Sequence, residues 1–129
     1  MRQQVIKLKV GKLESKGVAK IWRINKSNIK KRLVMRAVVE EGGYLEMKGK
    51  IVIGKNIADV DVFLEQRVLL MGVGARAVVI PELEIESNEV KAGHATSVGQ
   101  IDQEQLFYLT SRGLTRELAV KLLIEAFLA

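Results

Sequence analysis

The chain has 129 residues, of which 48% are hydrophobic, with a net charge of +6 and no cysteine. This composition fits one globular domain with a modest core and excludes a disordered tail, disulfides, thiolate-bound zinc and thiol nucleophiles. Because no apolar run reaches the roughly 18 residues of a membrane span and the first residues lack a signal peptide's apolar region, we expect a cytoplasmic protein.

The positive charge is concentrated in the first part of the sequence. Residues 1–55 contain 15 Lys or Arg and 4 Asp or Glu, whereas residues 56–129 contain 6 and 11. Such a basic part can attract nucleic acid or an acidic partner. However, the lysines of residues 6–10 alternate with apolar residues, as on a solvated strand face, and only Trp22 and Tyr44 offer aromatic surface there. Nucleic-acid binding is therefore the least favoured function.

Short strands rich in Val, Ile and Leu are predicted along the first two thirds of the chain, separated by Gly, Asn and Ser residues. With no room for crossover helices, the strands form either an antiparallel sandwich or barrel, or the coils of a β-solenoid. The absence of Asn-Gly and Asp-Gly hairpin signals favours the solenoid. Pro81 is expected at an edge, a bend or a strand start. The predicted strands cover residues 5–10, 18–24, 32–39, 44–53, 60–72 and 75–87.

Small residues surround His94, the only histidine, and predict a turn over residues 89–100. Two short helices follow. Asp102 is the expected N-cap of the first, with Gln105 three residues later as in a capping box, and Gly113 ends it. Thr115 is the expected N-cap of the second helix, whose apolar face (Leu118, Leu122, Leu123, Ala126 and Phe127) we expect to pack on the chain's own core rather than on a partner. Residues 1–100 thus form a β-domain, and residues 101–129 a helical segment packed on it.

Four pieces of the C-terminal part, "PELEI", "EVKAGHATSVGQ", "DQEQLFYLTSRGL" and "LLIEAF", occur in this order. Together they resemble the C-terminal part of the SufB/SufD family of iron–sulfur cluster assembly proteins, and more nearly its D-type member. The similarity is close over residues 69–127. It implies an all-β core in the form of a right-handed parallel β-helix, followed by two short C-terminal α-helices.

The resemblance also implies partners and a site. Family members work with an ABC-type ATPase that docks on the C-terminal helices, and B-type and D-type subunits pair through their β-helices. His94 matches a histidine of the assembly site, where a transient iron–sulfur cluster or iron would be shared with the partner. Gln105, Phe107, Tyr108 and Arg112 match part of the docking segment.

This sequence departs from the family pattern in two ways. Ala92 stands where many D-type members have cysteine, and the chain is much shorter than a full-length member. Because clusters need about three or four ligands, His94 requires ligands from a second subunit or from nearby carboxylates. Those carboxylates alternate with apolar residues, which favours a solvated strand face. They are Glu82, Glu84, Glu86 and Glu89.

No catalytic constellation is present in the sequence. Gly72 and Gly74 lack the Gly-Lys-Ser/Thr of a phosphate loop, and no nucleophile elbow surrounds Ser97. We therefore expect a scaffold or accessory protein rather than an enzyme. The alternative is a stand-alone, dimeric β-helical interaction module without cluster chemistry.

Overall fold

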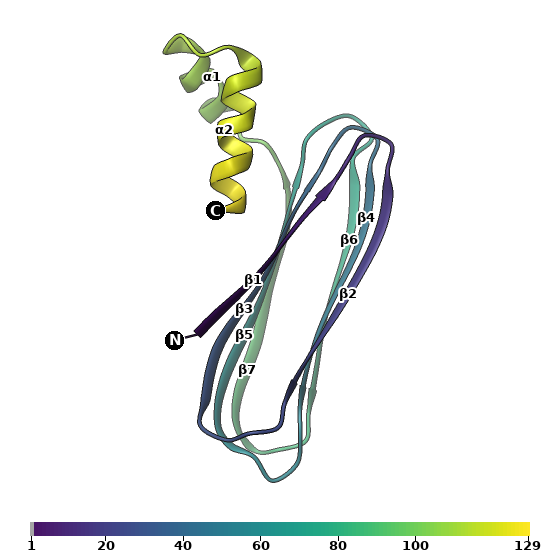
Figure 1. Ribbon diagram of the computed structural model, residues 1–129, viewed down its shortest axis with the longest axis vertical. Helices are drawn as coiled ribbons and strands as arrows, with labels where there is room; N and C mark the ends of the chain where they lie inside the picture. The colour runs from purple at the N-terminus through teal and green to yellow at the C-terminus, as the bar shows by residue number, and fades with distance from the viewer. Residues whose placement is uncertain (1) are drawn as a thin grey trace.

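The structure, a computed structural model, describes residues 2–129 as seven β-strands followed by two α-helices (Figure 1). The strands are β1 (Arg2–Val10), β2 (Ser15–Ile24), β3 (Ile29–Val39), β4 (Tyr44–Ile53), β5 (Ala58–Leu70), β6 (Arg76–Ile85) and β7 (Glu89–Gln100). The helices are α1 (Gln103–Ser111) and α2 (Arg116–Leu128).

The strands form two sheets, and the chain alternates between them. Sheet A has the order β1-β3-β5-β7, and sheet B has the order β2-β4-β6. Every pairing is parallel, and each strand pairs with the strand two positions along the chain, about 30 residues away. Successive coils therefore stack on one another. Figure 1 shows them one behind another, with sheet A on the left and sheet B on the right. This is a β-solenoid with two C-terminal helices, so the predicted fold class is confirmed.

The core lies between the two sheets. Alternate residues of each strand point inward, and paired residues of parallel strands share a face, so inward positions stack in columns through the coils. Leu33 and Leu64 form such a column in sheet A, and Met47 of sheet B belongs to the same core. All three are fully buried. The alternation of Val, Ile, Leu and Met with polar residues therefore specifies which face of each strand is inside.

Stacked corners connect the sheets in place of hairpin turns. Asn28 and Asn56 adopt positive φ angles of 62° and 59° at equivalent corners, a conformation that Asn tolerates better than most residues. Serine hydroxyls join one corner to the next: Ile57 N–H donates to Ser87 Oγ at 3.1 Å, and Ala58 N–H donates to Ser27 Oγ at 3.0 Å. These contacts fix the register of the coils at their polar ends.

Helix α1 begins and ends as expected from its caps. The Asp102 carboxylate accepts from Glu104 N–H at 2.9 Å and from Gln105 N–H at 3.3 Å. Gly113, with a φ angle of 97°, follows the helix, and Thr115 caps α2 by accepting from Leu118 N–H at 3.2 Å. Both caps and the glycine stop are confirmed.

Helix α2 packs against the outer face of sheet A, mainly over β3. The outward side chains Val34 and Val38 of β3 are fully buried. The predicted apolar face of α2 is only partly correct, because Leu118 and Leu122 are 43% and 40% exposed. The other three residues of that face, Leu123, Ala126 and Phe127, border a groove together with Val68 and Leu69 of β5.

The predicted turn over residues 89–100 is wrong. These residues form β7, a 12-residue strand that pairs with β5 along its length. Gly, Ala and Ser have low strand propensity, but the parallel ladder to β5 outweighs that local preference. Pro81 lies in β6, an edge strand of sheet B, as expected from its missing N–H. Within residues 2–129, neither helix is long and apolar enough to cross a membrane.

Candidate functional site

The solenoid has an open end at its last two strands, which we call the β6–β7 end. β6 and β7 are the edge strands of sheet B and sheet A, and each has one side without a strand partner within residues 2–129. Their inward side chains are half-buried or exposed, because no further coil covers them. The inward row of β6 is Ala77, Val79, Pro81, Leu83 and Ile85, and that of β7 is Val90, Ala92, His94, Thr96 and Val98.

His94 points into this open end. It pairs in register with Leu64, whose side chain is fully buried inside the solenoid, so the imidazole is on the inward face of β7. Ala92 and Thr96 flank it on the same face. The imidazole is exposed, and the inward rows of β6 and β7 contain no charged residue. The site is therefore an apolar, uncharged surface with one imidazole near its middle.

Two of the four carboxylates considered in sequence as companions of His94 are directed elsewhere. Glu82 and Glu84 are on the outward face of β6, where they lie 3.9 and 3.7 Å from Lys50 Nζ. Within residues 2–129, no group of three His, Asp or Glu side chains is arranged to hold a metal ion. His94 can thus contribute one nitrogen ligand, and the other ligands of a metal or cluster have to come from elsewhere.

The candidate docking residues share helix α1 and its C-cap. Phe107 and Tyr108 are 73% and 55% exposed, an unusual exposure for large aromatic side chains on a helix. The Arg112 guanidinium lies 5.0 Å from the centre of the Tyr108 ring and holds it from one side. Gln105 is separate from this surface, because it borders a groove between β7 and α2 of about 580 Å³. The structure therefore brings Tyr108 and Arg112 together, and Phe107 is exposed on the same helix.

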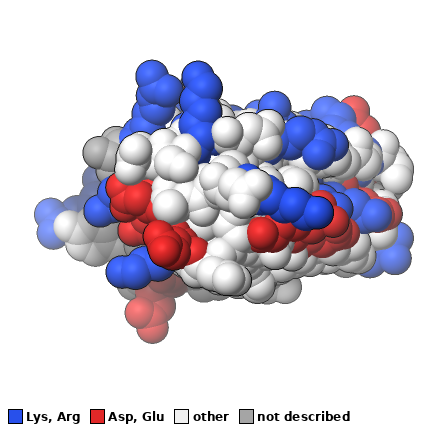
Figure 2. All heavy atoms as spheres, turned by 90° about the horizontal axis from the view of Figure 1, so that it is seen from below, with Lys and Arg blue, Asp and Glu red and all other residues white. Residues whose placement is uncertain are grey.

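Charge is distributed unequally between the two ends of the solenoid. Residues 2–24 (β1 and β2) contain seven Lys or Arg and one Glu, whereas residues 76–100 (β6 and β7) contain two Lys or Arg and four Glu. Figure 2 shows Lys and Arg side chains projecting from the upper edge of the molecule, and Asp and Glu side chains across its middle and lower part. The first coil is thus strongly basic and the last coil weakly acidic.

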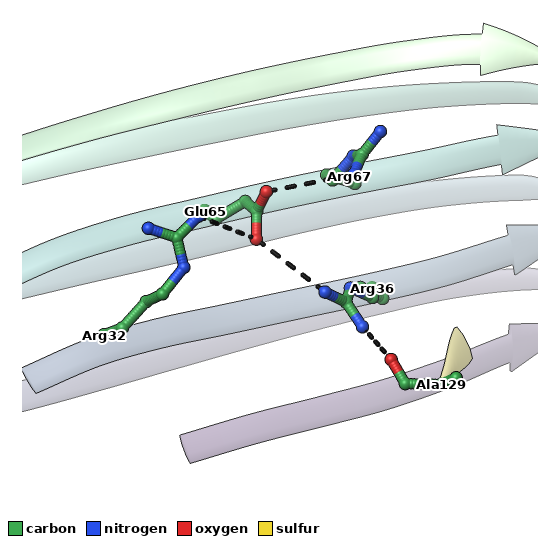
Figure 3. Close-up of polar contacts among 5 residues, drawn as sticks. All are labelled: Arg32, Arg36, Glu65, Arg67 and Ala129. Carbon is green, nitrogen blue, oxygen red and sulfur yellow. Dashed lines mark hydrogen bonds and ion pairs between the residues drawn. The ribbon is translucent and has the colours of Figure 1, made fainter. Parts of the chain in front are cut away.

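Four charged residues on the outer face of sheet A connect the strands to the end of α2 (Figure 3). The Glu65 carboxylate lies 3.3 Å from Arg32, 3.9 Å from Arg67 and 4.0 Å from Arg36. Arg36 also donates to the main-chain oxygen of Ala129, and the Arg67 guanidinium lies 5.9 Å from the Phe127 ring centre. This arginine cluster anchors the last turn of α2 to β3 and β5.

Sequence reasoning missed the arginine cluster. A signal for it exists in the spacing of about 30 residues between paired strands. Aligning the predicted strands at that offset would have placed Arg36 beside Arg67.

The fold defines a class of protein: a parallel β-solenoid followed by a C-terminal helical hairpin. The family model described as "SUF system FeS cluster assembly, SufBD core domain" matches residues 19–127. The chain therefore belongs to the SufBD family.

Individual relatives agree with this assignment. The iron–sulfur cluster assembly protein SufD of Escherichia coli (strain K12) is 35% identical over 105 residues, which cover 81% of this chain and 25% of the relative. SufD of Bacillus subtilis (strain 168) is 46% identical over 81 residues, covering 63% and 18%. An iron–sulfur cluster assembly SufBD family protein of Mycobacterium leprae (strain TN) is 45% identical over 80 residues, covering 61% and 20%. The chain spans a quarter or less of the length of these relatives.

Proposed function

We propose that this chain is a scaffold or accessory component of iron–sulfur cluster assembly that acts through protein–protein contacts. The observation that carries the proposal is the open β6–β7 end of a SufBD core, with His94 in the middle of an uncharged inward row. An exposed apolar surface of this kind is typical of a site that a partner covers. The chemistry of the site is then completed by the partner.

The partner proposed for the β6–β7 end is a second β-solenoid. Sheet A has one strand more than sheet B. At the open end, β7 of sheet A therefore projects beyond β6 of sheet B by half a coil, which we call the half-coil step. Two such ends related by a two-fold axis along the strands fit without a gap, because β7 of one protein then pairs with β6 of the other in both sheets. Each junction is antiparallel, and two-fold contacts of this kind close on themselves.

In such a pair, His94 is enclosed at the junction. A neutral imidazole nitrogen is a competent iron ligand, and enclosure removes the water that competes for iron. Because this chain has no cysteine, the remaining ligands of a nascent cluster must be supplied by the partner subunit. The cluster is thus a cargo shared by the two subunits. This chain contributes one ligand, His94, and the apolar surface around it.

The second proposed partner is the ABC-type ATPase of the Suf system, bound through α1. Phe107 and Tyr108 give this surface two adjacent exposed rings, and aromatic residues are the commonest energetic anchors of protein interfaces. Arg112 adds a cation that orients Tyr108. The arginine cluster supports this role, because a docking helix has to be fixed to the solenoid to transmit motion to it.

The ATPase contact can be tested by anaerobic binding measurements with the Suf-type ATPase of the same organism. We expect saturable binding by the wild type and at least about a tenfold loss for the Phe107→Ala, Tyr108→Ala double variant, since removing an anchor residue costs about 2 kcal/mol. The matched control, Leu13→Ala with Val73→Ala, removes apolar side chains that are 85% and 88% exposed on solenoid corners. It should bind as the wild type does.

Equal binding by both double variants would contradict the docking surface. No binding by the wild type at micromolar concentration would contradict the ATPase partner altogether. In that case the better reading is a stand-alone solenoid that dimerises through its β6–β7 end without cluster chemistry, which the open half-coil step equally favours.

A further inference from the structure

The opposite end of the solenoid, formed by β1 and β2, has a different chemistry. We call it the β1–β2 end. Lys16 and Lys20 of β2 pair in register with Leu45 and Gly49, which are buried in the core, so both lysine side chains start from inward positions. Inward lysines in a middle coil would be buried without partners. Here both are exposed.

Two polar contacts cross the β1–β2 end from one sheet to the other. Lys16 Nζ donates to the main-chain oxygen of Lys9 at 3.4 Å, and Trp22 Nε1 donates to Gln4 Oε1 at 3.1 Å. Lys20 Nζ lies 5.9 Å from the centre of the Trp22 ring. The indole covers the core beneath it, since Trp22 is only 7% exposed. The end is therefore closed by its own side chains.

These features oppose the stacking of another coil on this end. A stacked coil would remove two ammonium groups from water, and the only carboxylate in residues 2–24 is Glu14, which already lies 3.6 Å from Lys16. Inward charges at an edge are a known protection against edge-to-edge association. The seven basic residues of this coil also repel a second basic end.

Head-to-tail stacking is opposed by geometry as well. If β1 of one copy paired with β7 of another, sheet A would continue, but β2 and β6 would be separated by the width of one missing strand in sheet B. The attraction between the basic first coil and the weakly acidic last coil would then act across a gap in the sheet. Open filaments built from this head-to-tail contact are therefore disfavoured.

We propose that the β1–β2 end is a built-in cap, which makes the association of this solenoid one-ended. Gln4, Lys16, Lys20 and Trp22 form the cap, and the uncharged β6–β7 end is left as the single surface for edge pairing. The cap stands whether or not the chain takes part in cluster assembly, because it rests on the side chains of the first coil alone.

The cap is tested by removing its charges. In the Lys16→Leu, Lys20→Leu variant, we expect new association through the β1–β2 end, seen by sedimentation as a weight-average mass at least about twice that of the wild type at the same concentration. The matched control, Lys12→Leu with Lys48→Leu, removes the same charge and adds the same leucines at exposed positions outside the cap. It should sediment as the wild type does. A mass unchanged in the cap variant would overturn the proposal.

A second measurement needs no variant. Trp22 is the only tryptophan, so acrylamide quenching of its fluorescence reports on the cap alone. If the β1–β2 end stays free, the quenching constant of the wild type is the same at low and high protein concentration. A quenching constant that falls as concentration rises would mean that another copy covers the cap, and it would overturn the proposal even if the leucine variant fails to fold.

Discussion

Gln66 is the one buried polar residue among those that the structure describes, and it lies in the middle of the solenoid core. Its Nε2 atom approaches Met35 Sδ at 3.8 Å, a weak hydrogen bond at best, and its Oε1 atom has no partner. A Cβ atom added to Gly49 would lie 3.1 Å from the same amide nitrogen, so glycine opposite Gln66 makes room for the side chain. The amide is thus accommodated by shape, but it is incompletely hydrogen-bonded.

Replacement of Gln66 should therefore change stability in opposite directions according to volume. We expect Gln66→Met to raise the free energy of unfolding by about 1 kcal/mol, because an unsatisfied buried oxygen is removed at nearly constant volume. Gln66→Ala should lower it by about 2 to 4 kcal/mol, because a cavity remains. Urea unfolding of the three proteins measures both. A destabilised Gln66→Met would mean that the amide is satisfied in the native protein, for instance by a buried water.

The last turn of α2 depends on Phe127 and its contact with Arg67. Phe127→Ala should lower the free energy of unfolding by about 1 to 2 kcal/mol, since a half-buried ring and its cation–π contact are lost. Amide hydrogen exchange should rise in α2 and stay unchanged in β3–β5. The control Leu122→Ala, at a position 40% exposed, should change stability by less than about 0.5 kcal/mol. Equal effects of the two substitutions would show that the arginine cluster does not anchor the helix.

The elements differ in how far the sequence could predict them. The helix caps Asp102 and Thr115 and the stop at Gly113 are local chemistry, and all three were predictable. β7 was not, because Gly93, Ala95 and Ser97 contain no strand signal and the ladder to β5 is a contact over about 30 residues. The location of His94 on the inward face followed only from that register. Its role in assembly, and that of the α1 surface, stay predictions.

The two ends of the solenoid differ, and only the β6–β7 end is proposed to pair with another protein. Lysine substitutions at adjacent residues of β7 should therefore have different effects on association. Thr96 is inward and Ala95 outward, and both are exposed. We expect the wild type to form dimers in sedimentation experiments, Thr96→Lys to stay monomeric, and Ala95→Lys to behave as the wild type does. A buried lysine without a partner would cost several kcal/mol at the junction, whereas an outward lysine is solvated.

The opposite ranking would rule out pairing through the inward rows. If Ala95→Lys disrupted association and Thr96→Lys did not, the contact would lie on the outer face of sheet A. If neither had any effect, the β6–β7 end would not be an interface between copies of this chain.

The unequal strand number of the two sheets also constrains how this fold can change in length. With four strands in sheet A and three in sheet B, the first and last strands belong to the same sheet. Both termini therefore lie on the side of sheet A, as Figure 1 shows, and α2 rests on the face where the chain starts. Insertion or deletion of a whole coil preserves this arrangement. Gain or loss of a single strand between β3 and α1 would carry the hairpin across to sheet B and away from Arg36, so viable length variants in that part of the chain should differ in steps of about 30 residues.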